Sequence, residues 1–479
     1  MLNPRTGTSG LTIYFGLWLL GCLFVSGKET RADGEIYSTR PAADQALSIR
    51  SLPSPFLEPK DLSAYNTKII QVFNQRQCPG TRGLLSAELY SQLGPLTLAI
   101  AAYCDPDRNQ AELRFQRAEI EDPSNDSIAL LHAHYASQHS TADSVELWKQ
   151  VLRLTHNQRI ATIAKAFLQG TGDAFPQVQV DLPILTYANL VLGPRYETNP
   201  LLQSLSYPHL SGSLGLGAAL NAGIQHPWDF GSLSAQYSLV YDAYTVVPGA
   251  NLVTQQLEVP FAIRAGDQED LKVRLFGSDT ALGPSQYSLL GGLGVEGVAY
   301  HSNTRQTVQG SVFADHYFDP NLRGQAGSHF RFDYRWEFFQ QASYANIALW
   351  VEHVAAGRKV NSVDLSRLNF SHTDLGTEIY LERQFRRIMV GLYVKTYLRE
   401  DRNDSSYYSS TQTLITKRRQ DLNLSLGPNL IFSLGATAQL IAAYRFNRNY
   451  SNFAGRDYFD ATYADHTVQI AFRKFWGNF

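Results

Sequence analysis

Hydrophobic and polar residues alternate with a period of two over most of the chain after Gly170. In residues 210–224 the even positions are mostly leucine, alanine or isoleucine, and the odd positions are mostly serine, glycine or asparagine. In residues 330–338 aromatic residues alternate with Arg and acidic residues. This period predicts strands with one apolar and one polar face. Because the pattern persists without helices or continuous apolar runs, it favours a membrane barrel with a polar lumen over a soluble sandwich.

The alternating region divides at Gly, Pro, Asn, Asp and Ser clusters into segments of strand length. They lie near residues 185, 216, 238, 260, 274, 292, 310, 331, 348, 379, 392, 426, 441 and 470. This predicts an antiparallel barrel of about 14 strands, with a count of 12 or 16 as the alternatives. Bacterial barrels have an even number of strands. The connection at 227–229 is short and those at 361–372 and 401–420 are long. Short periplasmic turns and long outer loops are the expected asymmetry.

From about residue 62 to 170 the apolar spacing is helical, and part of it repeats. The first repeat places residues at the offsets of the tetratricopeptide pattern: Leu98, Ala99, Ala102, Ala111, Phe115, Ala118 and Pro123. The second follows about 33 residues later, with Leu131, Tyr135, Ser144, Trp148 and Val151, but His132 stands where a small residue is usual. Residues 159–168 are expected to cap the stack. Generic helical hairpins are the alternative interpretation.

The N-terminus has the features of an export signal. Leu11–Val25 is an unbroken apolar run, too short for a spanning helix of about 20 residues. We expect cleavage near Lys28; a lipidated Cys22 and an uncleaved anchor are the alternatives. The predicted organisation is a signal peptide (1–27), a linker (28–61), a periplasmic helical repeat domain (62–172) and an outer-membrane barrel (173–479).

Composition and charge narrow the function classes. The 479 residues carry a formal net charge of -2, without a long run of Lys or Arg, so nucleic acid is not expected as a partner. A mean hydropathy of -0.22 excludes a helical membrane bundle. Removal of the signal leaves Cys78 and Cys104, which either form one disulfide, as exported proteins permit, or remain two buried thiols.

Motifs that carry chemistry are weak throughout. The sequence has no G-x-S-x-G elbow, H-E-x-x-H pair or Walker loop. Gly292–Gly297 matches G-x-G-x-x-G but lies inside an alternating strand, and His132 and His134 point to different faces of a helix. We therefore expect no catalytic residue, no cofactor and no metal site. A barrel-embedded hydrolase, with residue types such as those at 328, 329 and 333, is the remaining enzymatic alternative.

Two basic clusters and the C-terminus bear on the surroundings of the barrel. The basic clusters suggest contacts with lipopolysaccharide phosphates or a positive electrostatic field in the lumen, or else solvated turns. Their members are Arg383, Arg386 and Arg387, and Lys417, Arg418 and Arg419. A terminal aromatic residue on an amphipathic strand is the mark that the barrel assembly machinery recognises, and the chain ends in Phe479. Phe475 and Phe479 are out of phase with Val468, Ile470 and Phe472, so a bulge or a mixed face is expected.

One segment carries a family resemblance. Residues 187–200, YANLVLGPRYETNP, open the barrel after the signal and the repeats. Gly193, Tyr196, Asn199 and Pro200 match the Gly-x-x-Tyr-(Asp/Glu)-(Thr/Ser)-Asn-Pro stretch with which members of the surface lipoprotein assembly modulator family begin their barrels. In its order of parts and its size, nearly the whole mature chain resembles that family.

The resemblance implies a translocator and not an enzyme. Members carry lipid-anchored proteins across the outer membrane of Gram-negative bacteria, with the barrel as conduit and the repeats acting in the periplasm. The implied partners are lipoprotein clients, periplasmic chaperones, the barrel assembly machinery and the outer membrane with its lipopolysaccharide. A pore for polysaccharide or small solutes, with the repeats recruiting partner proteins, is the main alternative.

Overall fold

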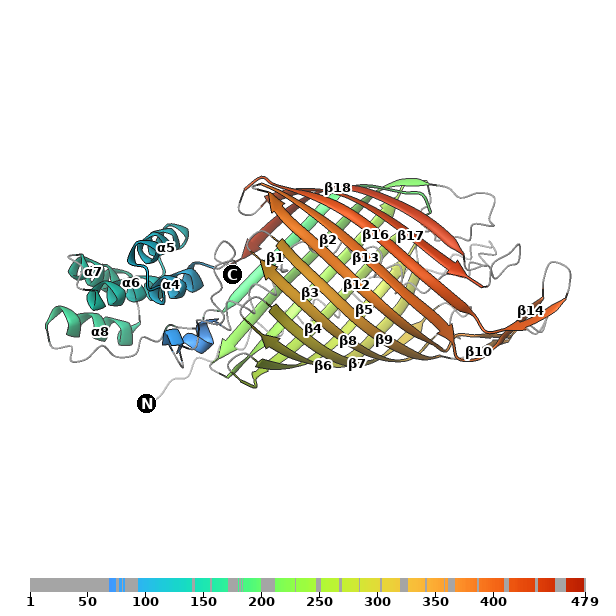
Figure 1. Cartoon of the computed structure of the whole chain (residues 1–479), viewed down its shortest axis with the longest axis horizontal. Helices are drawn as coiled ribbons and strands as arrows, with labels where there is room; N and C mark the ends of the chain where they lie inside the picture. Colours follow the sequence, from blue (N-terminus) through green and yellow to red (C-terminus); the bar gives the residue numbers. More distant parts are fainter. Residues whose placement is uncertain are drawn as a thin grey trace, which may run out of the picture.

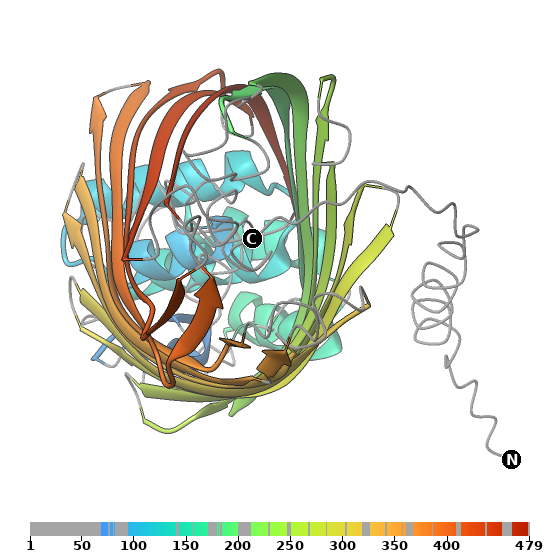
Figure 2. The same ribbon diagram turned by 90° about the vertical axis from the view of Figure 1, so that its right-hand side faces the viewer.

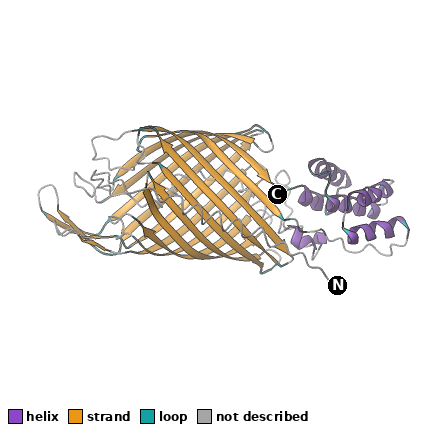
Figure 3. Ribbon diagram, turned by 180° about the vertical axis from the view of Figure 1, so that it is seen from behind, coloured by secondary structure: helices purple, strands orange, loops and turns teal. Residues whose placement is uncertain are grey.

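The structure is a computed structural model that describes the chain between residues 69 and 477, apart from internal stretches. The longest of these stretches are 82–93, 171–179, 200–211 and 453–461. The expected signal peptide and linker, together with Pro200 and Phe479, lie outside the described residues. Helices gather at one end of the molecule and strands form the rest (Figure 3).

Five of the described helices form a compact stack. Their bounds are α4 (Pro95–Tyr103), α5 (Arg108–Glu121), α6 (Asp126–Gln138), α7 (Ser144–Leu154) and α8 (Gln158–Leu168). Helix α4 packs on α5, α6 packs on α7, and α8 covers α7. Asn125 begins α6 by accepting hydrogen bonds from two backbone N–H groups, as an N-cap does. Gly170, with φ of 69°, ends the stack in the left-handed conformation that favours glycine.

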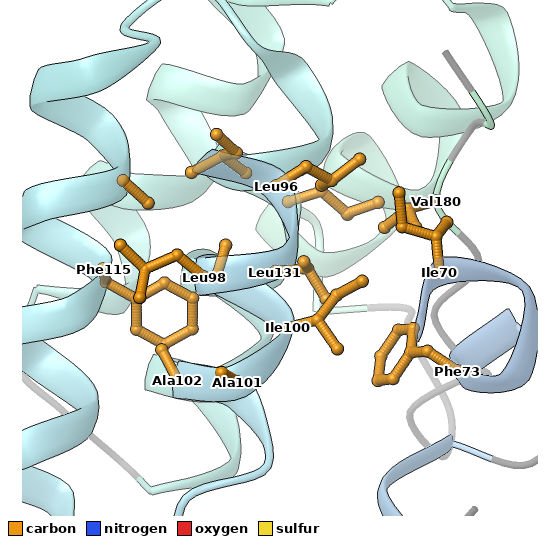
Figure 4. Close-up of a cluster of buried hydrophobic side chains, with 14 of the residues drawn as sticks. Ile70, Phe73, Leu96, Leu98, Ile100, Ala101, Ala102, Phe115, Leu131 and Val180 are labelled. Atoms are coloured by element: carbon orange, nitrogen blue, oxygen red, sulfur yellow. The ribbon is translucent and has the colours of Figure 1, made fainter. Parts of the chain in front are cut away.

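The stack buries one continuous apolar core. Ala111, Phe115 and Ala118 of α5 and Trp148 of α7 are all buried in it, and Pro123 lies in the turn between α5 and α6. Figure 4 shows Phe115 beside Leu98, and Ile100 facing Phe73. The small residues of α4 and α5 let the two backbones approach, because alanine adds no bulk between helices.

The rest of the described chain is a closed antiparallel barrel of 14 strands, which confirms the predicted fold class. The strands are β1 (Leu185–Glu197), β2 (Ser213–Trp228), β3 (Gly231–Tyr244), β4 (Leu252–Arg264), β5 (Glu269–Leu282), β6 (Ser285–Tyr300), β7 (Thr304–Tyr317), β8 (Gly327–Gln340), β9 (Ser343–Ala356), β12 (His372–Phe385), β13 (Ile388–Asp401), β16 (Gln420–Ser433), β17 (Ala438–Ser451) and β18 (Tyr463–Gly477). Each of the positions predicted from the alternating pattern falls within one of them. Neighbours in sequence pair in space, and β1 closes the barrel by pairing with β18.

The two ends of the barrel differ in their connections. At the end nearest the helices, here the turn end, β2 and β3 are joined by residues 229–230 and β12 and β13 by residues 386–387. At the opposite end, here the loop end, β9–β12 and β13–β16 are joined by the predicted long connections. These fold into a small sheet beyond the wall (Figure 1): β10 (Arg358–Val360), β11 (Arg367–Asn369), β14 (Ser405–Tyr408) and β15 (Leu414–Lys417).

The closing strand is regular. Its register with β17 runs without a shift from Tyr463 to Lys474, so no bulge is needed within the described residues. Phe475 simply shares the inward face with Arg473, whose guanidinium lies 5.7 Å from its ring centroid. Of the two expected arrangements, the mixed face is the one found. The Gly292–Gly297 match lies inside β6, in the barrel wall.

Candidate functional site

The two faces of the barrel wall have opposite chemistry. On β8, Phe330 is 54% exposed on the outer face, whereas Glu337, on the inner face, is 1% exposed. The same division holds on β18, where Ile470 is 52% and Asp465 0% exposed. An apolar outer belt around a polar interior suits a barrel whose wall contacts lipid. The chain folds as an outer-membrane β-barrel. None of the described helices is long and apolar enough to cross a bilayer.

The inner face from β5 to β13 carries charges joined in pairs. Arg305 of β7 forms two hydrogen bonds with Glu337 of β8, one of them 2.7 Å long between Nη2 and Oε1. The hydroxyl of Tyr344 donates to the same carboxylate at 2.7 Å. Lys272 of β5 pairs with Glu296 of β6 at 2.9 Å. A charge buried away from water requires such a partner, so these pairs hold neighbouring strands together from inside.

Further along the same wall, a histidine is held between two acids. Nδ1 of His329 lies 2.8 Å from Glu352 and Nε2 lies 3.3 Å from Asp315. Arg331 pairs with Asp333 at 2.7 Å and lies over the ring of Trp350, 4.7 Å from its centroid. Positive and negative side chains therefore alternate on this wall. The interior is rich in hydrogen-bonding groups, and its positive and negative charges offset each other.

The family-motif segment joins the two strands that close the barrel. Thr198 Oγ1 and the backbone N–H of Asn199 donate to Asp465 of β18, at 3.2 and 2.9 Å. The Asn199 amide also donates to the carbonyl of Ala464 at 3.2 Å, and the N–H of His466 donates back to Thr198 Oγ1 at 2.8 Å. We call this set of bonds the seam clasp. It ties the loop end of β1 to the start of β18.

The motif also contributes a buried ion cluster beside the clasp. Arg195 pairs with Glu197 at 2.9 Å and with Asp242 of β3 at 3.2 Å. The hydroxyl of Tyr244 donates to Glu197. Tyr196, which lies between Arg195 and Glu197 in the chain, points outward and is 45% exposed. Alternation along β1 thus sends the charged motif residues inward and the aromatic one to the outer face.

Gly193 lies directly against the backbone of β18. A Cβ at this position would overlap the carbonyl oxygen of Ile470 and the Cα of Ala471. Register pairs between β1 and β18 run over 187–192 and 195–197 of β1 and omit Gly193 and Pro194. Proline has no N–H to donate, so this position cannot complete the ladder.

The residues of the alternative hydrolase are not brought together. Ser328 lies on the outer face of β8, whereas His329 and Asp333 lie on the inner face. Successive residues of a strand face opposite sides, and Ser328 is an odd number of positions from each of the other two. His329 and Asp333 are each engaged in the ion pairs above. This part of the described wall therefore holds no assembled Ser-His-acid arrangement.

The two helical histidines have separate environments. His132 stacks on Phe115 at 4.5 Å between centroids and contacts Glu119 at 2.8 Å and Glu112 at 3.3 Å. Burial opposes its charge, but the two carboxylates outweigh burial and raise the pKa of His132. Burial lowers the pKa of His134 to about 4, and its Nδ1 lies 2.9 Å from the Tyr103 hydroxyl. Among the described residues no three His, Cys, Asp or Glu are placed to hold a metal ion.

Cys78 and Cys104 are joined in a disulfide, with Cα atoms 5.1 Å apart.

The two basic clusters lie at opposite ends of the barrel. Arg383 and Arg387 are at the turn end, while Arg418 is exposed at the loop end and pairs with Glu400 at 3.3 Å. Sequence reasoning did not single out the seam clasp or the partners of His132, since these contacts join residues far apart in the chain.

Comparisons with known proteins add little at this distance. No family model matches the chain, and no curated protein matches it. Similar solved structures include OmpT of Vibrio cholerae, with 10% identity, a TM-score of 0.34, and coverage of 61% of this chain and 97% of that chain. The anion-selective porin from Comamonas acidovorans has 9% identity and a TM-score of 0.33, covering 61% of this chain and 99% of that chain. The barrel assignment rests on the closed strand order and on the opposite chemistry of the two faces of the wall.

Proposed function

We propose that this protein moves lipoproteins across the outer membrane to the cell surface. The observation that carries the proposal is the position of the helical stack at the turn end of a barrel with a polar interior (Figure 1). Short turns face the periplasm in such barrels, so we infer that the helices are periplasmic. A client held there would meet the mouth of the barrel directly.

The division of labour follows from the two surfaces. We infer that the stacked hairpins are tetratricopeptide-type repeats, whose concave faces bind extended peptides. The partly exposed polar groups of the lumen, such as the Arg331–Asp333 pair, would offer an unfolded chain hydrogen bonds in place of water. Folding of the client outside would supply direction, because a folded domain cannot return. A client variant that cannot fold but is displayed at the normal rate would contradict this step.

The motif residues support the same proposal structurally. Gly193 and Asn199 lie where β1 pairs with β18. The segment that resembles the surface lipoprotein assembly modulator family therefore stabilises the pairing that closes the barrel wall. We propose no catalytic role and no cofactor. The proposed neighbours are lipoprotein clients, periplasmic chaperones, the barrel assembly machinery and lipopolysaccharide.

The test is deletion of the gene in its host, followed by protease shaving of intact cells and mass spectrometry of the released lipoproteins. We expect one or a few lipoproteins to leave the shaved fraction while remaining in whole-cell extract, and to return on complementation. An unchanged surface set would contradict the proposal. A loss of extracellular polysaccharide instead would favour the pore alternative, for which the charged and aromatic lumen residues, such as Arg331 and Trp350, are suited.

A further inference from the structure

A short helix lies between the helical stack and the turn end of the barrel. Residues 69–74, here the mouth helix, are helical and lie at the turn end (Figure 1). Ile69 and Phe73 are 0% exposed and Gln71 is 6% exposed. A helix on the surface of a protein keeps a polar face toward water. The mouth helix has none, so it is covered from both sides.

On the barrel side, the mouth helix is bonded to the turn between β2 and β3. Nε2 of Gln71 donates to the carbonyl oxygens of Trp228 and Gly231, at 2.6 and 2.9 Å, in the turn between β2 and β3. Val298 and Tyr300, on the inner face at the end of β6, belong to the same apolar cluster as the helix. The printed bonds of the mouth helix are to the β2–β3 turn, and the apolar cluster to which it belongs continues to the inner end of β6, three strands further along the wall from β3.

On the other side, the mouth helix is bound more firmly to the helical stack. The disulfide Cys78–Cys104 joins the chain just after it to the end of α4. Phe73 meets the ring of Tyr103 edge-on at 5.5 Å, and Figure 4 shows Phe73 facing Ile100 of α4. A covalent bond and an apolar core therefore link it to α4, whereas the two hydrogen bonds of Gln71 link it to the barrel.

The axial view supports the same arrangement. Figure 2 looks along the barrel from the loop end, and the helices lie behind the opening, within its outline. We propose that the mouth helix is a plug that obstructs the turn end of the lumen and leaves it together with α4. The plug goes beyond the proposed function, because it controls any flow through the barrel, with or without a lipoprotein client.

The test measures ion flow through the purified full-length protein in planar lipid bilayers. Gln71→Glu keeps the size of the side chain but sets a carboxylate against two carbonyl oxygens, which should expel the helix from the mouth. We expect the mean current per barrel to rise at least threefold over the unaltered protein. The matched control is Gln110→Glu, on the exposed start of α5, which should leave the current unchanged.

Folding is checked separately by the shift in gel mobility that a folded barrel shows before and after boiling. If Gln71→Glu does not fold, Gln71→Ala, which removes both hydrogen bonds without adding charge, is measured in the same way. A folded variant with the current of the unaltered protein would overturn the plug. No client is present in this measurement, so its result does not depend on whether the protein moves lipoproteins.

Discussion

Gly193 has no room for a side chain, since an added Cβ would overlap backbone atoms of β18. Gly193→Ala must therefore push the closing strands apart at the point where Pro194 already interrupts the ladder. We expect the yield of folded barrel in the outer membrane to fall severalfold, measured by the heat-dependent gel shift. Gly310→Ala is the control, because an added Cβ there meets nothing within 4 Å. Equal yields from both variants would show that the seam tolerates the extra atom.

The seam clasp makes a second prediction at this scale. Asn199→Ala removes the amide that donates to Ala464, while the backbone bond to Asp465 remains. Loss of one buried hydrogen bond costs about 1–3 kcal/mol. We expect a lower urea midpoint for the loss of barrel structure, followed by the gel shift. Tyr196→Phe is the control, because Tyr196 points outward. If this change lowered the urea midpoint as much as Asn199→Ala does, the seam clasp would not be what stabilises the barrel.

His132 and His134 should give the helical stack opposite dependences on pH. The pKa of His132 is raised in the folded state, so its stabilisation is present below about 6.5 and lost as pH rises through the folded pKa. The pKa of His134 is lowered to about 4, so it destabilises the fold as pH falls below about 6.5, by about 2 kcal/mol at pH 5.

The two effects separate in single variants. Urea unfolding of the full chain, followed by helical circular dichroism, would measure the stack from pH 5 to 8.5. Relative to the unaltered protein, His134→Gln should gain stability as pH falls, and His132→Gln should lose it. Parallel pH curves for the two variants would show that neither histidine titrates as its contacts require.

At the scale of elements, the disulfide is the strongest constraint on the start of the helical stack. It closes a loop of 26 residues in sequence separation, which in the chain-entropy description stabilises the fold by roughly 3 kcal/mol. Cys78→Ser/Cys104→Ser should lower the urea midpoint of the helical transition and leave the barrel unchanged. Dithiothreitol should do the same to the unaltered protein and nothing to the double variant. A midpoint insensitive to both treatments would contradict this role.

The strands were more predictable than their contacts. Alternation is a local property, so β8 could be predicted from Phe330–Phe338 alone, and the same holds along the barrel. The pairing of Arg305 with Glu337, or of Asn199 with Ala464, depends on register and closure. Contacts of this kind join residues up to 268 positions apart, and a local hydrophobic period carries no information about them.

At the scale of the whole molecule, the helical stack and the barrel form one continuous body at the turn end. The apolar cluster runs from α5 through the mouth helix to Val298 and Tyr300 of β6. The order of helices and barrel could be predicted from the change of period after Gly170. Their junction could not, because residues 69–74 look like any short apolar helix in sequence, and only the fold shows that Gln71 meets the barrel turn.

The most direct test of the central claim uses the purified full chain in liposomes, inserted with the helical stack outside, and a surface lipoprotein of the same host offered unfolded from outside. Protease added afterwards digests whatever has not crossed. The account predicts that the lipoprotein becomes protected inside, and that liposomes lacking the chain protect none. A chain that conducts ions under the same conditions but protects no lipoprotein would contradict translocation and leave a pore for other solutes.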